Sequence, residues 1–241
     1  MNKLSIGFSN TVEPPTRRGY LFIDDDVPDV PGSRVFDPAI HSFNPLAGID
    51  EKKARELAEL LYLIFPQGEN TLTVRNGRRA LAPALLKAGR LDKVEGDEEV
   101  NGLIADILFT PIARQVLCKP TNFSFNVRTA TFARINRAEL GERDALLFGL
   151  LLMHHYRGQL VVPDLGFYGR NAHANLVRED RLIGGVAFLD ELPEKLRQAC
   201  LSIETKTLTH ASSADAELIA KLSGYVWGTN GFLDFIERAT D

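Results

Sequence analysis

The stretch at residues 159–209, QLVVPDLGFYGRNAHANLVREDRLIGGVAFLDELPEKLRQACLSIETKTLT, decides the fold class. Short apolar runs at 159–162, 182–189 and 203–209 are typical of buried strands, and the segments between them have the length and pattern of helices. Strands that alternate with such helices predict a mainly parallel sheet with helices on both faces. We therefore expect an α/β protein. The helices expected here are 171–178, 193–201 and, just beyond the stretch, 213–222.

The chain upstream predicts more strands and a helical middle. Strands are expected at 19–23, 33–36 and 129–135, and one helix begins after Asp50, a residue type that favours helix N-caps, and stops before Pro66. Further helices are expected at 75–87, from about Val100, from Thr110 and at 141–156. The segment at about 75–120 reads as a helical insertion, so we expect the whole chain, 1–241, to form a single α/β domain.

Composition and charge place the chain among ordinary globular proteins. Its 241 residues are 44% hydrophobic and 25% charged, which excludes a wholly disordered or fibrous chain. A formal net charge of -4 gives no general attraction to phosphate backbones, so nucleic-acid binding is possible but not favoured. Two cysteines cannot form a disulfide framework, and Cys118 and Cys200 lie in apolar segments typical of a core.

The amino terminus carries no pattern of a leader or a lipid anchor. MNKLSIGFSN has one lysine and no apolar run of the length that a signal peptide needs. The longest apolar stretch, 145–153, falls short of the roughly 18 residues that a membrane span requires. These patterns predict a cytoplasmic protein that does not associate with membranes.

Four segments together resemble one family of proteins. They are VFDPAIHSFNPLAG (35–48), ARELAELLYLIF (54–65), GENTLTVRNGRRALAPALL (68–86) and LVVPDLGFYG (160–169). In this order they look like the core of the FtsK/HerA-type P-loop ATPases and the TraG-like conjugative coupling proteins, in which a strand ending in Asp-Pro precedes an Asn-Pro-Leu turn and a helix. The resemblance spans roughly residues 19–222 and implies a RecA-like fold of a motor that works as a ring.

The resemblance assigns a candidate role to Asp164. A carboxylate at the carboxyl end of a strand faces the nucleotide crevice of such folds, so Asp164 lies where the family's Walker B acid supports magnesium. This chain departs from the family because Leu165 stands where a catalytic Glu follows that Asp, and Pro163 precedes it. The other interpretation is that Asp164 caps a turn at the edge of the sheet.

The phosphate-binding loop of the family is missing from the sequence. No Gly-x-x-x-x-Gly-Lys-Ser/Thr occurs anywhere, and Gly166 and Gly169 do not make one. Without that loop and its Lys the main stabilisation of the β and γ phosphates is lost, so independent ATP hydrolysis is not expected and no catalytic residue is assigned. No cofactor is expected; ATP and magnesium would bind only if an upstream segment or partner chain completed the site.

Two basic clusters are candidate binding surfaces. Arg170 and His173 follow Asp164 closely and suit a phosphate or an acid of a neighbouring subunit, and Arg75, Arg78 and Arg79 form a second basic face along one expected helix. Acidic stretches at 24–26 and 97–99 complement these clusters, which favours docking between subunits. Both clusters are also compatible with plain solvated surface.

The resemblance and the missing loop lead to one functional hypothesis. The chain is expected to be a degenerate motor-ATPase-like structural or assembly subunit, linked to DNA transfer or a mobile element. It would act as a homo-oligomer or beside a partner ATPase subunit. Two alternatives stay open: an ATPase core fragment whose nucleotide site another segment or chain completes, and a DNA-associated scaffold.

Overall fold

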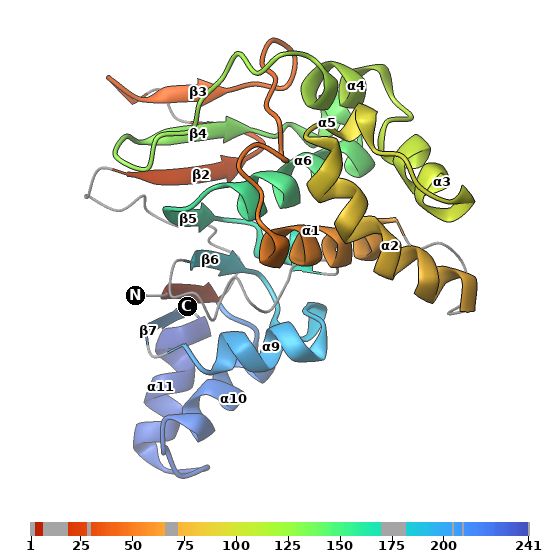
Figure 1. Ribbon diagram of the computed structural model, residues 1–241. Helices are drawn as coiled ribbons and strands as arrows, with labels where there is room; N and C mark the ends of the chain where they lie inside the picture. Colours follow the sequence, from red (N-terminus) through yellow and green to blue (C-terminus); the bar gives the residue numbers. More distant parts are fainter. Residues whose placement is uncertain are drawn as a thin grey trace. The chain divides into compact units, whose positions relative to one another are not determined.

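The computed structural model describes residues 3–6, 19–27, 30–65, 72–169, 182–203, 205–208 and 210–240 (Figure 1). The chain divides into two compact units. Unit 1 comprises Met1–Asp24 and Gly158–Asp241, and unit 2 comprises Asp25–Arg157. The expected helical insertion at 75–120 falls within unit 2. That the chain forms a single domain stays a prediction.

Unit 1 is built on five described strands that run parallel. Their order across the sheet is β2-β5-β6-β1-β7, and each of the four neighbouring pairs is parallel. This confirms the predicted α/β fold with a parallel sheet. The strands are β1 (Lys3–Ile6), β2 (Tyr20–Asp24), β5 (Gln159–Val162), β6 (Leu182–Val186) and β7 (Thr205–Leu208).

Strand β1 is an addition to the predicted strands. Strands were predicted at 182–189 and 203–209, and β1, which was not predicted, lies between β6 and β7 and pairs with both. Its four residues bury Leu4 and Ile6 and alternate them with Lys3 and Ser5. So short an alternation gives a weak sequence signal, which is why the strand was missed.

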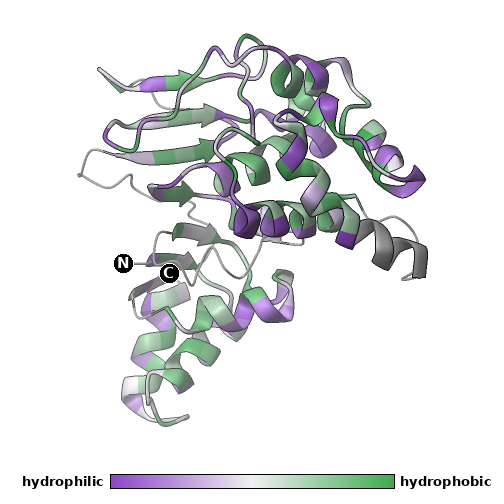
Figure 2. Cartoon of the chain, in the orientation of Figure 1, coloured by the Kyte–Doolittle hydropathy of each residue, from purple (hydrophilic) through white to green (hydrophobic). Residues whose placement is uncertain are grey.

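The central strands of unit 1 are apolar along their whole length. All five residues of β6 are buried, as are Leu160, Val161 and Val162 of β5. Parallel strands that are covered on both faces need such continuous apolar runs, and Figure 2 shows the strands mainly in the hydrophobic colour.

The helices of unit 1 follow its strands. They are α7 (Leu165–Gly169), η2 (Leu189–Glu191), α9 (Glu194–Leu201), α10 (Ser213–Leu222) and α11 (Asn230–Thr240). Helices α9 and α10 confirm the predicted segments. Helices α7 and α11 were not predicted, and the predicted helix at 171–178 lies outside the described residues.

Unit 2 holds one parallel strand pair and several helices with clear caps. Asp50 accepts a hydrogen bond from Lys53 N (2.9 Å), and Thr110 does the same from Ala113 N (3.1 Å), so side chains begin two helices as predicted. The elements are β3 (Arg34–Phe36), paired with β4 (Thr131–Arg134), and α1 (Glu51–Ile64), α2 (Leu72–Ala88), η1 (Leu91–Lys93), α3 (Glu98–Ile107), α4 (Pro111–Cys118), α5 (Arg137–Leu140) and α6 (Glu142–His155).

An aromatic cluster joins the loops of unit 2 to β3 and α6. Ring centroids lie 4.8–5.9 Å apart in the contacts that join its members. Such tilted and edge-on pairs add to the burial of the rings. The cluster therefore fixes two irregular loops without secondary structure of their own. Its members are Phe36, His41, Phe43, Phe123, Phe125 and His155.

Among the described residues, no single helix has the length and apolar character to cross a membrane. Helices α3 and α4 meet those two criteria only when they are taken together as a pair, and they are bent by 101° at the break between them.

The two histidines of the aromatic cluster make stability depend on pH. Burial is the main cause that lowers the pKa of His41 and of His155 below the ordinary 6.5. The unfolded chain therefore binds more protons, so this stability is complete above about pH 6.5 and is lost as pH falls through the lowered folded values. We predict that the free energy of unfolding, measured by urea titration, falls between pH 7 and pH 5 and falls less in His155→Phe.

The matched control for this prediction is His210→Asn, which removes an exposed histidine of unit 1. It should leave the pH dependence of the unchanged protein intact. An identical pH dependence in His155→Phe and in the unchanged protein would show that the ring of His155 is not the titrating group.

Candidate functional site

The carboxyl edge of the unit 1 sheet is the first candidate site. Parallel strands end at the same edge, and in open α/β sheets ligands bind there. The register that pairs Phe22 with Val161, continued by two residues, sets Asp24 beside Pro163. Asp24 ends β2 and Asp164 follows the end of β5 by two residues, so both lie at the carboxyl edge of two neighbouring strands.

Strand β1 ends at the same edge. It lies between β6 and β7 and runs parallel to both, so its carboxyl end points the same way as those of β5 and β6. Residues 7–18, which follow β1, lie outside the described residues.

Asp164 is the N-cap of the short helix α7. Its Oδ1 accepts a hydrogen bond from Phe167 N at 3.0 Å, and the side chain is half-buried. This geometry agrees with the interpretation of Asp164 as a cap at the sheet edge. Its role toward magnesium stays a prediction.

Leu165 has a packing role at the position where the resembled family has a catalytic Glu. Its side chain is fully buried. A β-carbon added at Gly184 of β6 would lie 3.2 Å from Leu165 Cδ2, so α7 lies tightly against that strand. A carboxylate in this place would lose its hydration. The residue therefore supplies an apolar contact in place of a group that could orient water.

Metal-binding side chains do not gather within the described ranges. No group of three or more His, Cys, Asp or Glu in them could hold a metal ion.

The structure describes only some of the predicted basic residues. Arg79 is exposed on α2. Arg75 and Arg78 lie on the same helix, but their side chains are outside the described part of the structure, and so are the whole of Arg170 and His173. The expected clusters around Asp164 and along α2 stay predictions.

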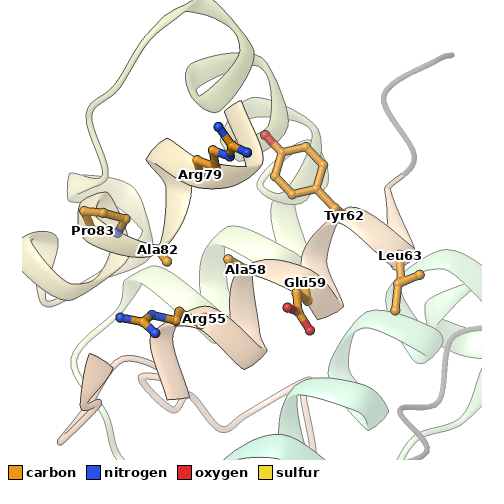
Figure 3. Close-up of a pocket in the computed structure, with 8 residues that line it drawn as sticks. All are labelled: Arg55, Ala58, Glu59, Tyr62, Leu63, Arg79, Ala82 and Pro83. Carbon is orange, nitrogen blue, oxygen red and sulfur yellow. The ribbon is translucent and has the colours of Figure 1, made fainter. Parts of the chain in front are cut away.

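Arg79 borders a pocket between α1 and α2 that the sequence did not reveal. The pocket has a volume of about 700 Å³. Small residues, Ala58 and Ala82, leave room between the helices, and Figure 3 shows Tyr62 with its hydroxyl end toward Arg79. The arrangement offers guanidinium groups beside an apolar floor. The pocket is lined by Arg55, Ala58, Glu59, Tyr62, Leu63, Arg79, Ala82 and Pro83.

The two cysteines are not poised as nucleophiles. Burial raises the pKa of the Cys118 thiol and raises that of Cys200 to about 12. Both thiols are therefore protonated at neutral pH, and a protonated thiol is a poor nucleophile. Cys118 lies beside a smaller pocket of about 360 Å³ near α3 and α4.

Comparison with known proteins identifies the fold. No family model matches the chain, and no curated protein matches it. Among solved structures, it is similar to VirB4 of Thermoanaerobacter pseudethanolicus, with a TM-score of 0.52 and 11% sequence identity over 93% of this chain and 81% of that one. The chain has the fold of that VirB4 structure. At this identity the likeness establishes the fold alone.

The cap role of Asp164 predicts a specific mutational pattern. Asp164→Ala removes the acceptor for Phe167 N and should lower the free energy of unfolding by about 0.5–2 kcal/mol. Asp164→Asn keeps an acceptor oxygen and should lower it much less. Urea titrations of the three proteins, each with and without magnesium, provide the measurement.

A metal site at Asp164 would give a different outcome. Magnesium would then raise the melting temperature of the unchanged protein but not of Asp164→Asn, because the amide has lost the negative charge that a divalent cation needs.

Proposed function

We propose that the chain is a structural or assembly subunit with a motor-ATPase-like fold that does not hydrolyse ATP on its own. One observation carries the proposal: the fold is that of VirB4, yet the sequence holds no Gly-x-x-x-x-Gly-Lys-Ser/Thr. The connection from β1 to β2 consists of residues 7–19 only. A phosphate-binding unit needs about eight loop residues and then a helix between its strands, so this connection is short for such a unit.

The packing at the sheet edge supports the same proposal. The buried side chain of Leu165 replaces the acid that would orient an attacking water. Asp164 is engaged with a backbone amide of α7. One acid is therefore replaced by an apolar side chain, and Asp164 itself takes part in holding the fold together.

A link to DNA transfer or to a mobile element belongs to this proposal. Its support is twofold: the likeness of the fold to VirB4, and the independent sequence resemblance to FtsK/HerA-type and coupling-protein cores. The chain would act as a homo-oligomer or beside a partner ATPase subunit. Its net charge of -4 argues against a role as a DNA scaffold by itself.

A second candidate function is an ATPase core whose nucleotide site another segment or chain completes. The feature that favours it is the pair Asp24 and Asp164, which lie at the carboxyl ends of the neighbouring strands β2 and β5, the edge where open α/β sheets bind ligands. In this case the chain would bind ATP and magnesium only in the complete assembly.

We predict that the purified chain has no magnesium-dependent ATPase activity above background, measured as phosphate release. Turnover should stay far below about 1 per second, the low end for enzymes, because the phosphate loop is missing. Turnover at or above that rate that disappears in Asp164→Ala would refute the proposal. A melting temperature raised by ATP and magnesium only after a partner is added would favour the second candidate.

Association is predicted to depend on the basic face of α2. Charges at the rim of an interface set its sensitivity to salt, so raising ionic strength should weaken the complex and Arg78→Glu with Arg79→Glu should weaken it further. Lys52→Glu on α1, where the side chain is 82% exposed, is the matched control and should have little effect. Light scattering at a series of salt concentrations tests this. Equal complex formation by the double variant would exclude this face.

A further inference from the structure

The turn between α10 and α11 exposes an unusual amount of apolar side chain. We call residues 222–233 the hairpin tip. It contains no charged residue. Five of its large apolar side chains are exposed: Leu222 (60%), Tyr225 (38%), Val226 (68%), Trp227 (70%) and Leu233 (55%). The tip is thus a neutral, aromatic surface on a chain that is a quarter charged.

The backbone of the hairpin tip is held by its own hydrogen bonds. Tyr225 N donates to Ala220 O (3.0 Å), and Thr229 Oγ1 donates to Val226 O (2.7 Å). Gly224 and Gly228 have φ angles of 84° and 78°, which other residues adopt at a cost. Since the loop is already ordered, a partner would not need to order it, and the entropy cost of binding is small.

Contacts beneath the tip fix its aromatic residues. Phe232 is buried, and its ring lies 6.4 Å from that of Trp227, while Tyr225 lies 5.0 Å from Phe235. At the base, Ala211 N donates to Ala239 O at 2.8 Å, which ties the start of α10 to the end of α11. Trp227 and Tyr225 are therefore presented on a fixed support.

We propose that the hairpin tip is the surface through which two copies of this chain associate as a two-fold dimer. Side chains of this size present about 150–250 Å² each when aromatic, so the five exposed portions together offer on the order of 500 Å² of apolar area. An apolar area of this size is at the upper end of what the largest surface patch of a monomer exposes. It also equals the apolar part of a standard protein interface, which buries about 800 Å² on each partner.

Charge favours a second copy as the occupant. Each chain carries a net charge of -4, so two copies repel over most of their surfaces but not at the neutral tip. A two-fold interface is self-complementary, so the apolar side chains of one tip would meet the same side chains of the other. This inference uses none of the α2 arginines and does not rest on the proposed function.

The test is sedimentation or light scattering of the full chain over a range of concentrations. The unchanged protein should reach twice the chain's 26.7 kDa, and Val226→Asp should raise the dimer dissociation constant at least tenfold. Ile40→Asp is the matched control: Ile40 is 67% exposed and lies in unit 2, and its substitution should leave the dissociation constant unchanged.

Trp227 is the only tryptophan, so its fluorescence reports on the tip in the unchanged protein even if a variant fails to fold. Its emission should shift to longer wavelength on dilution, as the dimer separates and water reaches the ring. A chain that remains monomeric at high concentration would overturn the proposal. The proposal would also be overturned if the emission did not change with protein concentration but shifted when vesicles of phosphatidylcholine and phosphatidylglycerol were added. That result would assign the tip to a membrane surface.

Discussion

The parallel pairing of β2 with β5 is the constraint on which the rest of the structure depends. These strands are neighbours in the sheet, yet the whole of unit 2 lies between them in the sequence. The cost of closing so long a connection grows only slowly with its length, provided that the inserted unit is stable by itself. Arg137 contributes to the stability of unit 2 where that unit begins, because its Nε donates to Asp25 Oδ2 at 2.6 Å just after β2 ends.

Local signals in the sequence explain which elements could be predicted. Helix α1 follows from the cap at Asp50 and an apolar face of 3.6-residue period, and β5 from an apolar run of strand length. Strand β1 was missed because four alternating residues carry little local pattern. Helix α11 could have been predicted, because Phe232, Phe235, Ile236 and Ala239 recur with helical period. The insertion of β1 between β6 and β7 depends on long-range pairing, which no local pattern encodes.

In the candidate site, too, the features with a local sequence signal could be predicted and those that depend on tertiary contacts could not. Asp164 could be placed at a strand end from the sequence, since a carboxylate directly after an apolar run has few other positions in an α/β fold. Its hydrogen bond to Phe167 N depends on α7, a five-residue helix too short to leave a periodic pattern. The pocket between α1 and α2 depends on how closely the two helices approach at Ala58 and Ala82. The hairpin tip depends on which apolar side chains remain exposed after folding.

If the chain is the non-hydrolysing subunit that we propose, the packing of Leu165 explains how its fold persists without phosphoryl transfer. In an active phosphoryl-transfer site, polar groups at the sheet edge stay hydrated and strained by function, at a cost in stability. Here the side chain after Asp164 lies against Gly184 and is fully buried, so the edge contributes to the core. In a subunit without catalysis, selection at that edge would act on stability and on outward surfaces. The neutral aromatic surface at residues 222–233 and the arginines of α2 are then the features of this chain through which a non-catalytic subunit would act.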